Sequence, residues 1–182
     1  RKIPCYLKIG IWISKKAAGR DLLPPRLLAW YPKVAISSGI LEVLVAHQDG
    51  KLDKRMLKLV RLQTSFTVAC PFCLDMNCHD YKDYGITEKE LLALQDGAVF
   101  AEASTFSLRE KLALEYARLI SGSTVAFPAG FMIKLKANFT EREIVILAST
   151  TAQVNYWARL LQALGVPPAG FSDHCNLKLP SK

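Results

Sequence analysis

The residues best suited to chemistry in this chain are two cysteines, Cys70 and Cys73, separated by Pro71 and Phe72. Cysteine pairs of this spacing can exchange electrons, bind a metal ion or pack in a core as small apolar side chains. Because proline at the first helical position loses no hydrogen bond, the sequence predicts a helix that begins directly after Cys70. Both sulfurs then lie on one side of the helix start, where a disulfide between them is geometrically reasonable.

The expected position of Cys73 in the first turn favours its thiolate, because the positive end of the helix dipole lowers the pKa of a thiol there. The thiolate is the form that reacts with peroxides and disulfides. One alternative is that both cysteines are inert core residues. Another is zinc binding with Cys78, His79 or the neighbours His174 and Cys175, but no second ligand pair has zinc spacing. We therefore expect no metal and no cofactor.

The surroundings of the pair follow from helix geometry. If the helix continued beyond Asn77, a rotation of about 100° per residue would place one set of residues on a single stripe. This stripe consists of Cys70, Cys73, Asn77, Asp80 and Tyr84. His79 would lie about 120° away from Cys73, so we do not expect it to be a partner of the pair through this helix.

The elements that position the pair are predicted to be helices, so the expected fold class is all-α. Apolar residues recur at helical spacing over 34–47 and over 52–69. Three capping boxes, each a Ser or Thr followed three residues later by Glu, predict helices that begin at Thr87, Ser107 and Thr140. The second of these should reach about residue 120 and the third about residue 164.

The N-terminal region is less regular in its pattern. Pro24, Pro25 and Pro32 are expected to interrupt an N-terminal arm. Residues 9–13 alternate weakly and give a weak case for one strand.

Composition limits the classes of function. The chain has 182 residues, of which 51% are hydrophobic and 22% charged, which is enough for one domain with a real core. The net charge is +8, but the lysines and arginines are scattered, so we do not expect a nucleic-acid partner. No run approaches the roughly 18 apolar residues of a membrane span. The odd, sparse set of five cysteines favours the cytoplasm or another reducing compartment, although a targeting segment before Arg1 remains open.

The segment Cys70–Asn77, with the sequence C-P-F-C-L-D-M-N, resembles the carboxymuconolactone decarboxylase and AhpD-like alkylhydroperoxidase family. Further similar segments are Tyr84–Leu94, Phe139–Ile144 and Asn155–Arg159. The resemblance divides the chain into an N-terminal arm (1–33), an AhpD-like helical domain (34–171) and a C-terminal tail (172–182). Because the family is all-helical and forms homo-oligomers, commonly trimers or hexamers, the resemblance implies such an assembly.

The resemblance also implies an activity. In peroxidase members of this family, the second cysteine attacks a hydroperoxide and becomes a sulfenic acid, which the first cysteine resolves to a disulfide. The resemblance therefore implies a peroxiredoxin-type, antioxidant alkylhydroperoxidase in which Cys73 attacks and Cys70 resolves. Its partners would be a hydroperoxide or other small-molecule substrate and a dithiol reductant.

Two positions depart from the family pattern. Asn77 stands where peroxidase members carry a histidine, and Lys58 stands near the place of their glutamate. Neither side chain relays protons as imidazole and carboxylate do. Lys58 would instead stabilise a thiolate if it approaches the pair. The alternatives are a non-catalytic redox-sensing or structural oligomer and, less favoured, a lactone decarboxylase, because decarboxylase members lack the cysteine pair.

Overall fold

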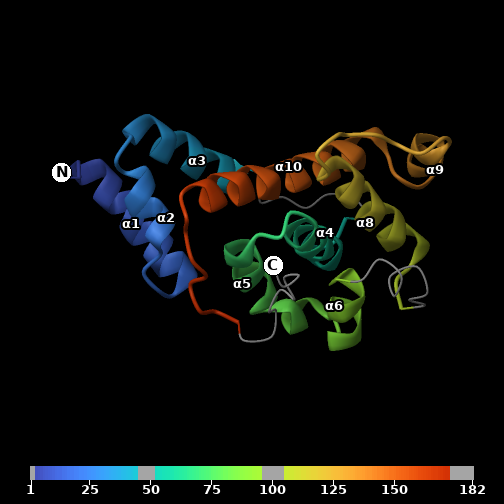
Figure 1. Ribbon diagram of the computed structural model, residues 1–182, viewed down its shortest axis with the longest axis horizontal. Helices are drawn as coiled ribbons and strands as arrows, with labels where there is room; N and C mark the ends of the chain where they lie inside the picture. The colour runs from blue at the N-terminus through green and yellow to red at the C-terminus, as the bar shows by residue number, and fades with distance from the viewer. Residues whose placement is uncertain (1–2, 45–51, 96–104, 173–182) are drawn as a thin grey trace, which may run out of the picture.

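The structure is a computed structural model that describes residues 3–44, 52–95 and 105–172, and all regular elements in these ranges are helices (Figure 1). The predicted all-α class is confirmed. In chain order the elements are α1 (Cys5–Ala18), α2 (Leu23–Leu28), α3 (Pro32–Leu44), α4 (Lys54–Thr67), α5 (Pro71–Cys78), the 3₁₀ helix η1 (Tyr81–Tyr84), α6 (Glu88–Gln95), α8 (Leu108–Ile120), α9 (Phe131–Asn138) and α10 (Glu141–Ala163).

The N-terminal arm is helical, which corrects two expectations. Residues 9–13 belong to α1 and form no strand. Two lysines lie in the last turn of α1, and Gly19 ends the helix in the left-handed conformation with φ of 71°. Pro24 and Pro25 lie in the first turn of α2, and Pro32 begins α3. These prolines therefore start helices, because the first turn has no intrahelical partner for their missing N–H groups.

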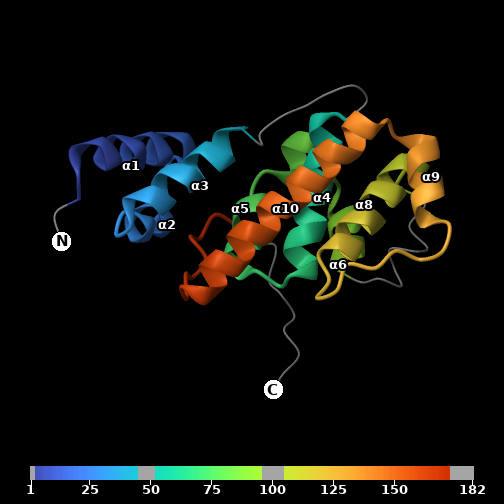
Figure 2. The same cartoon turned by 90° about the horizontal axis from the view of Figure 1, so that it is seen from above.

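Helix α4 lies at the centre of the molecule and contacts α5, α6, α8 and α10. Figure 2 shows α1–α3 at one end of the molecule and α9 at the other, with α4 and α10 between them. Asp53 caps α4 by accepting a hydrogen bond of 2.8 Å from the Met56 backbone N–H. Every residue from 56 to 65 is buried except Arg61, which is partly exposed. This stretch contains two cations, Lys58 and Arg61, whose charges the surrounding helices must accommodate.

In the described ranges, the core consists of three apolar clusters, two of which include residues of α4. The first contains the fully buried Leu59, Leu62 and Leu74, and the second joins α4 to α8, α9 and α10. The third encloses the cysteine pair. Burying one leucine side chain completely contributes about 1.5–3 kcal/mol, so these clusters fix the helices around α4. No helix in the described ranges is both long and apolar enough to cross a membrane.

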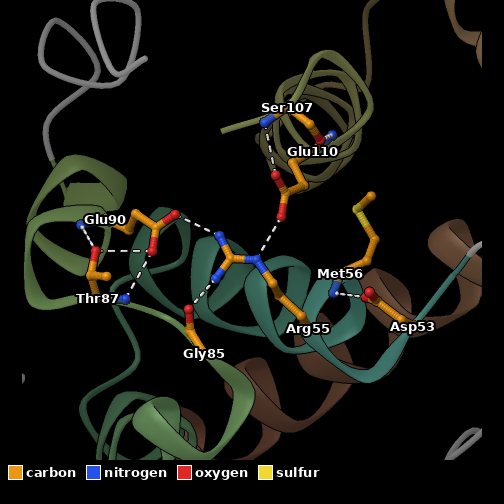
Figure 3. A network of polar contacts seen from close by, with 8 residues as sticks. All are labelled: Asp53, Arg55, Met56, Gly85, Thr87, Glu90, Ser107 and Glu110. Atoms are coloured by element: carbon orange, nitrogen blue, oxygen red, sulfur yellow. Dashed lines mark hydrogen bonds and ion pairs between the residues drawn. The ribbon is translucent and has the colours of Figure 1, made fainter. Parts of the chain in front are cut away.

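Arg55 connects two of the predicted capping boxes (Figure 3). Within each box, glutamate Oε2 accepts a 2.8 Å hydrogen bond from the capping backbone N–H, of Thr87 for Glu90 and of Ser107 for Glu110. The other oxygen of each carboxylate binds the Arg55 guanidinium, at 2.5 Å for Glu90 and 2.8 Å for Glu110. Both predicted boxes are confirmed, and one side chain holds the starts of α6 and α8 against α4.

The electrostatics of this network favour the charged glutamate. Burial alone would raise the pKa of Glu90, but hydrogen bonds from Arg55 and Thr87 outweigh it and leave that pKa below its usual value. Burial likewise opposes the charge of Arg55, yet Glu90 and Glu110 raise the pKa of its guanidinium.

The third capping box begins α10, and its glutamate likewise binds the capping N–H with one oxygen and an arginine with the other. Glu143 Oε2 accepts a 2.8 Å hydrogen bond from the Thr140 backbone N–H, while its Oε1 accepts one of 2.9 Å from Arg109. Arg109 also donates to the Asn138 carbonyl and lies 4.1 Å above the ring of Phe139. The predicted box is confirmed, and its arginine joins α8 to the start of α10.

Candidate functional site

The cysteine pair follows an unusual turn at the end of α4. Ala69 adopts the left-handed conformation with φ of 47°. Its N–H bonds to the Phe66 carbonyl at 3.0 Å, and the Cys70 N–H bonds to the Ser65 carbonyl at 3.2 Å. This pair of bonds closes a helix end that normally uses glycine, and the conformation costs an L-residue about 1–2 kcal/mol. The turn therefore ties the Cys70 backbone directly to α4.

Cys70 is the N-cap of α5 and Pro71 is its first residue, as the sequence predicts. Cys70 Sγ accepts a hydrogen bond of 3.2 Å from the Cys73 backbone N–H. A disulfide joins the two cysteines, whose Cα atoms are 5.3 Å apart. Cys70 is completely buried, whereas Cys73 is 5% exposed. Cys73 is thus the member of the pair that reaches solvent.

An apolar wall formed by α10 covers the pair. Ala158 and Leu161 are buried in the same cluster as both cysteines, and Trp157 packs against this cluster. The Trp157 indole N–H donates a 2.8 Å hydrogen bond to Glu42 Oε2 of α3. Gln153 donates to the same oxygen at 2.9 Å. Helix α3 therefore anchors the part of α10 that lies next to the cysteines.

Asn77 links the cysteine helix to α4. Its Nδ2 donates to the Cys73 carbonyl at 2.9 Å and to Ser65 Oγ at 3.2 Å. Ser65 Oγ in turn donates to the Arg61 carbonyl at 2.8 Å. Both Asn77 amide hydrogens are therefore engaged, and the side chain positions α5 without being able to relay a proton.

Lys58 lies among polar groups that follow α5. The expected single stripe is wrong beyond residue 78, because α5 ends at Cys78 and a separate 3₁₀ helix follows. Asp80 and Tyr84 nevertheless reach Lys58, whose Nζ lies 2.5 Å from Asp80 Oδ1 and 5.0 Å from the centre of the Tyr84 ring. Burial lowers the pKa of Lys58, while Asp80 opposes that change. No hydrogen bond joins Lys58 to either cysteine in the described part of the chain.

The side chains considered for zinc have other contacts. His79 Nδ1 lies 2.8 Å from the Met76 carbonyl, and its ring packs 5.1 Å from that of Phe171. Cys78 is fully buried and is itself disulfide-bonded. His174 and Cys175 lie outside the described residues. Within those residues, no group of three or more His, Cys, Asp or Glu side chains is arranged to hold a metal ion.

A C-terminal strap, residues 166–172, crosses the cysteine helix. The buried carboxylate of Asp75 holds it, accepting from the backbone N–H of Ala169 at 2.7 Å on Oδ2. Its Oδ1 accepts from Phe171 at 2.7 Å and Ser172 at 2.8 Å. Arg20, which precedes α2, binds the other side through the Ala169 carbonyl at 2.8 Å and stacks 4.1 Å from the Phe171 ring. The N-terminal arm thus contacts the strap that crosses α5.

Sequence reasoning missed Asp75 and Arg20. The available signal for Asp75 was its place between Leu74 and Met76, because a carboxylate in an apolar segment needs partners. Those partners lie 94 to 97 residues further along the chain, where no local pattern identifies them.

Comparison with known proteins agrees with this geometry. The model of the carboxymuconolactone decarboxylase family matches residues 38–118, which contain α4, α5, α6 and most of α8. The uncharacterized protein YnjA of Escherichia coli (strain K12) is 26% identical over 172 residues, covering 93% of this chain and 91% of YnjA.

Solved structures share the fold over nearly the whole chain. An uncharacterized peroxidase-related protein from Ralstonia eutropha JMP134, described as an alkylhydroperoxidase AhpD core, has a TM-score of 0.76 at 18% identity, covering 93% of this chain and 88% of its own. The debrominase Bmp8 has a TM-score of 0.77 at 15% identity, with coverages of 92% and 88%. The family match over residues 38–118 and the shared fold together support the carboxymuconolactone decarboxylase and AhpD-like family.

Proposed function

We propose that the protein is a thiol-dependent peroxidase in which Cys73 reduces a hydroperoxide and Cys70 regenerates it through a disulfide. The placement of the two sulfurs supports this function most directly. They lie within bonding distance at the N-terminus of α5, and Cys73 is the less buried of the two. The helix start favours a thiolate at Cys73 in the reduced protein.

The proposed reaction has three balanced steps. The Cys73 thiolate attacks the terminal oxygen of the hydroperoxide, the O–O bond breaks, and the alkoxide leaves as an alcohol after taking a proton from solvent. The Cys70 thiol then attacks the sulfenic acid sulfur on Cys73, forming the disulfide and releasing water. An external dithiol reduces this disulfide by two exchange steps and is itself oxidised to a disulfide.

Asn77 has a structural part in this scheme. It cannot transfer a proton, but its hydrogen bonds to Cys73 O and Ser65 Oγ fix the first turn of α5 against α4. Proton delivery from solvent would make the reaction slower than in a peroxidase with a histidine, because a positioned acid–base group typically contributes 10²–10⁴-fold.

The test measures consumption of cumene hydroperoxide with dithiothreitol as the dithiol. We expect turnover in the unaltered protein and none in Cys73→Ser. Cys70→Ser should consume about one equivalent per chain and stop, because its sulfenic acid has no resolving thiol. Cys5→Ser, which removes an exposed free thiol, serves as the control and should keep full turnover. Equal turnover in Cys73→Ser and the unaltered protein would refute the proposal.

Two other outcomes are distinguishable in the same assay. A redox sensor would lose its free thiols once and then cycle poorly with dithiothreitol. The debrominase Bmp8 shares the fold, and a cysteine-to-alanine variant of it is known in complex with 2,3,4-tribromopyrrole. This bromopyrrole is therefore a useful second substrate, and its debromination in place of peroxide reduction would redirect the proposal.

We also propose that the protein forms a homo-oligomer, as the family resemblance implies. Large apolar side chains are exposed on α1 and on the end of α3, among them Trp12 (60%), Val43 (74%) and Leu44 (70%). Apolar surface of this extent commonly marks an association site. Light scattering coupled to gel filtration should give a multiple of 20.2 kDa, and Val43→Glu should lower it.

A further inference from the structure

The buried middle of α4 carries two cations with different surroundings. Lys58 forms an ion pair with Asp80. Arg61 is partly buried, and its side chain makes no hydrogen bond or ion pair within the described ranges. A guanidinium has five N–H donors and stays protonated at neutral pH. A partly buried guanidinium without an acceptor would therefore be stabilised by a bound anion.

The pairing of α4 with α5 places Arg61 close to the reactive turn. Ser65 contacts Asn77 of α5 at 3.2 Å, and Lys58 contacts Asp80, two residues after the end of α5, at 2.5 Å. Arg61 lies between Lys58 and Ser65 on α4, at spacings of three and four residues that keep all three on one face. It therefore lies on the side of α4 that faces the end of α5, one helical turn before Ser65.

Glu42 and Tyr84 lie close enough to Arg61 to act on its charge. Burial lowers the pKa of Arg61, and the fields of Glu42 and Tyr84 oppose that change. Glu42 does not reach ion-pair distance and instead uses its Oε2 to accept from Gln153 and Trp157. Trp157 in turn packs on the cluster that contains Cys70 and Cys73. Through Glu42, the surroundings of Arg61 connect to the part of α10 that covers the cysteine pair.

We propose that Arg61 binds the carboxylate of an organic substrate whose reactive end reaches Cys73. This inference rests on the proposed function and narrows its substrate class to carboxylate-bearing hydroperoxides. A carboxylate matches the fork of a guanidinium, which can donate two parallel hydrogen bonds to it. The neighbouring Lys58 contributes little attraction, because Asp80 already compensates its charge.

Alkylation of Cys73 tests the anion site without any peroxidase activity. The reduced protein is treated with iodoacetate, which carries a carboxylate, or with neutral iodoacetamide, and Cys73 is followed by site-resolved mass spectrometry. The ratio of the two rates is then divided by the same ratio for glutathione. Because charge-assisted pairs of this type are worth about 10–100-fold, we expect a normalised ratio of at least about 10.

Two variants identify the residue responsible. Arg61→Gln should reduce the normalised ratio to about 1. Arg159→Gln removes one positive charge from the exposed face of α10 and should leave the ratio unchanged. A ratio near 1 in the unaltered protein, or an unchanged ratio in Arg61→Gln, would overturn the proposal. In case Arg61→Gln does not fold, octanoate must slow alkylation of the unaltered protein by iodoacetamide more than octanamide does, and equal protection would also overturn it.

The substrate preference is measured separately. We expect kcat/KM for a short hydroperoxide with a nearby carboxylate, 3-hydroperoxy-3-methylbutanoate, to exceed that for its methyl ester at least about 10-fold, and Arg61→Gln to remove the difference. Equal values for acid and ester in the unaltered protein would contradict the proposed preference. A raised alkylation ratio without any peroxide turnover would refute the proposed function alone. Full turnover with a ratio near 1 would refute the role of Arg61 alone.

Discussion

Replacing Asp75 with asparagine removes one negative charge and turns one of its two acceptors into a donor. The Oδ2 position, which accepts from the Ala169 N–H at 2.7 Å, would become an amide group facing that N–H. The bonds from Phe171 and Ser172 to Oδ1 would remain but lose their ionic character. The substitution preserves the shape of the side chain, so it tests the charge and its acceptors rather than packing.

The expected cost follows from these three bonds. A hydrogen bond to a charged group contributes about 1.5–3 kcal/mol and a neutral one about 0.5–1.5 kcal/mol. Losing one charged bond and weakening two others gives about 3–5 kcal/mol for detaching the strap. Since about 1.4 kcal/mol corresponds to a factor of ten, the strap should open at least about 10²-fold more often.

Hydrogen exchange measures this opening directly. We expect the amides of Ala169, Phe171 and Ser172 to lose protection in Asp75→Asn. Asp83→Asn, which makes the same change in charge on an exposed residue of η1, should leave them protected. Unchanged exchange of these three amides in Asp75→Asn would show that the carboxylate does not hold the strap.

Three further predictions concern the framework around the pair. Arg55→Gln should lower the free energy of unfolding by about 2–4 kcal/mol in urea, because it leaves two mostly buried carboxylates unpaired, whereas Arg159→Gln should change it little. The pKa of Glu90 is lower in the folded protein than in the unfolded chain, so its contribution is present above the unfolded pKa and is lost as pH falls through the folded one. The stability gap between Arg55→Gln and the unaltered protein should therefore narrow in acid, and a constant gap from pH 7 to pH 3 would contradict this reasoning. Ala69→Gly should raise the free energy of unfolding by about 0.5–1 kcal/mol, since glycine adopts φ of 47° without strain; lower stability would show that the turn is not strained. Lys58→Met removes a cation and leaves Asp80 uncompensated, and both changes should raise the pKa of the Cys73 thiol, as measured by the pH dependence of alkylation; an unchanged profile would exclude Lys58 from the site.

Local chemistry explains which parts of the structure could be predicted from the sequence. The N-cap at Cys70, the proline that follows it and the capping boxes involve residues at most three positions apart, so their types alone define the geometry. The end of α5 at Cys78 was missed because the sequence has no glycine or proline before Gly85.

The tertiary partners of the same groups carry no local signal. Glu90 and Glu110 are recognisable as capping residues, but their shared arginine lies 35 and 55 positions away. In the sequence, Asp75 cannot be distinguished from other helical aspartates, because its partners lie on the distant strap. Arg61 could be read as a surface arginine, because its partial burial depends on α3 and α10, which are distant in the sequence.

The strap also sets an order of events during synthesis. Phe171 follows Asp75 by 96 residues, so at about 5–20 residues per second the ribosome makes it about 5–20 s later. During this interval the start of α5 exists without α10 or the strap, and both thiols lack their cover. We therefore expect the two thiols to react with oxidants and alkylating agents more readily in the nascent chain than in the finished protein. The pair is most exposed to such modification during synthesis.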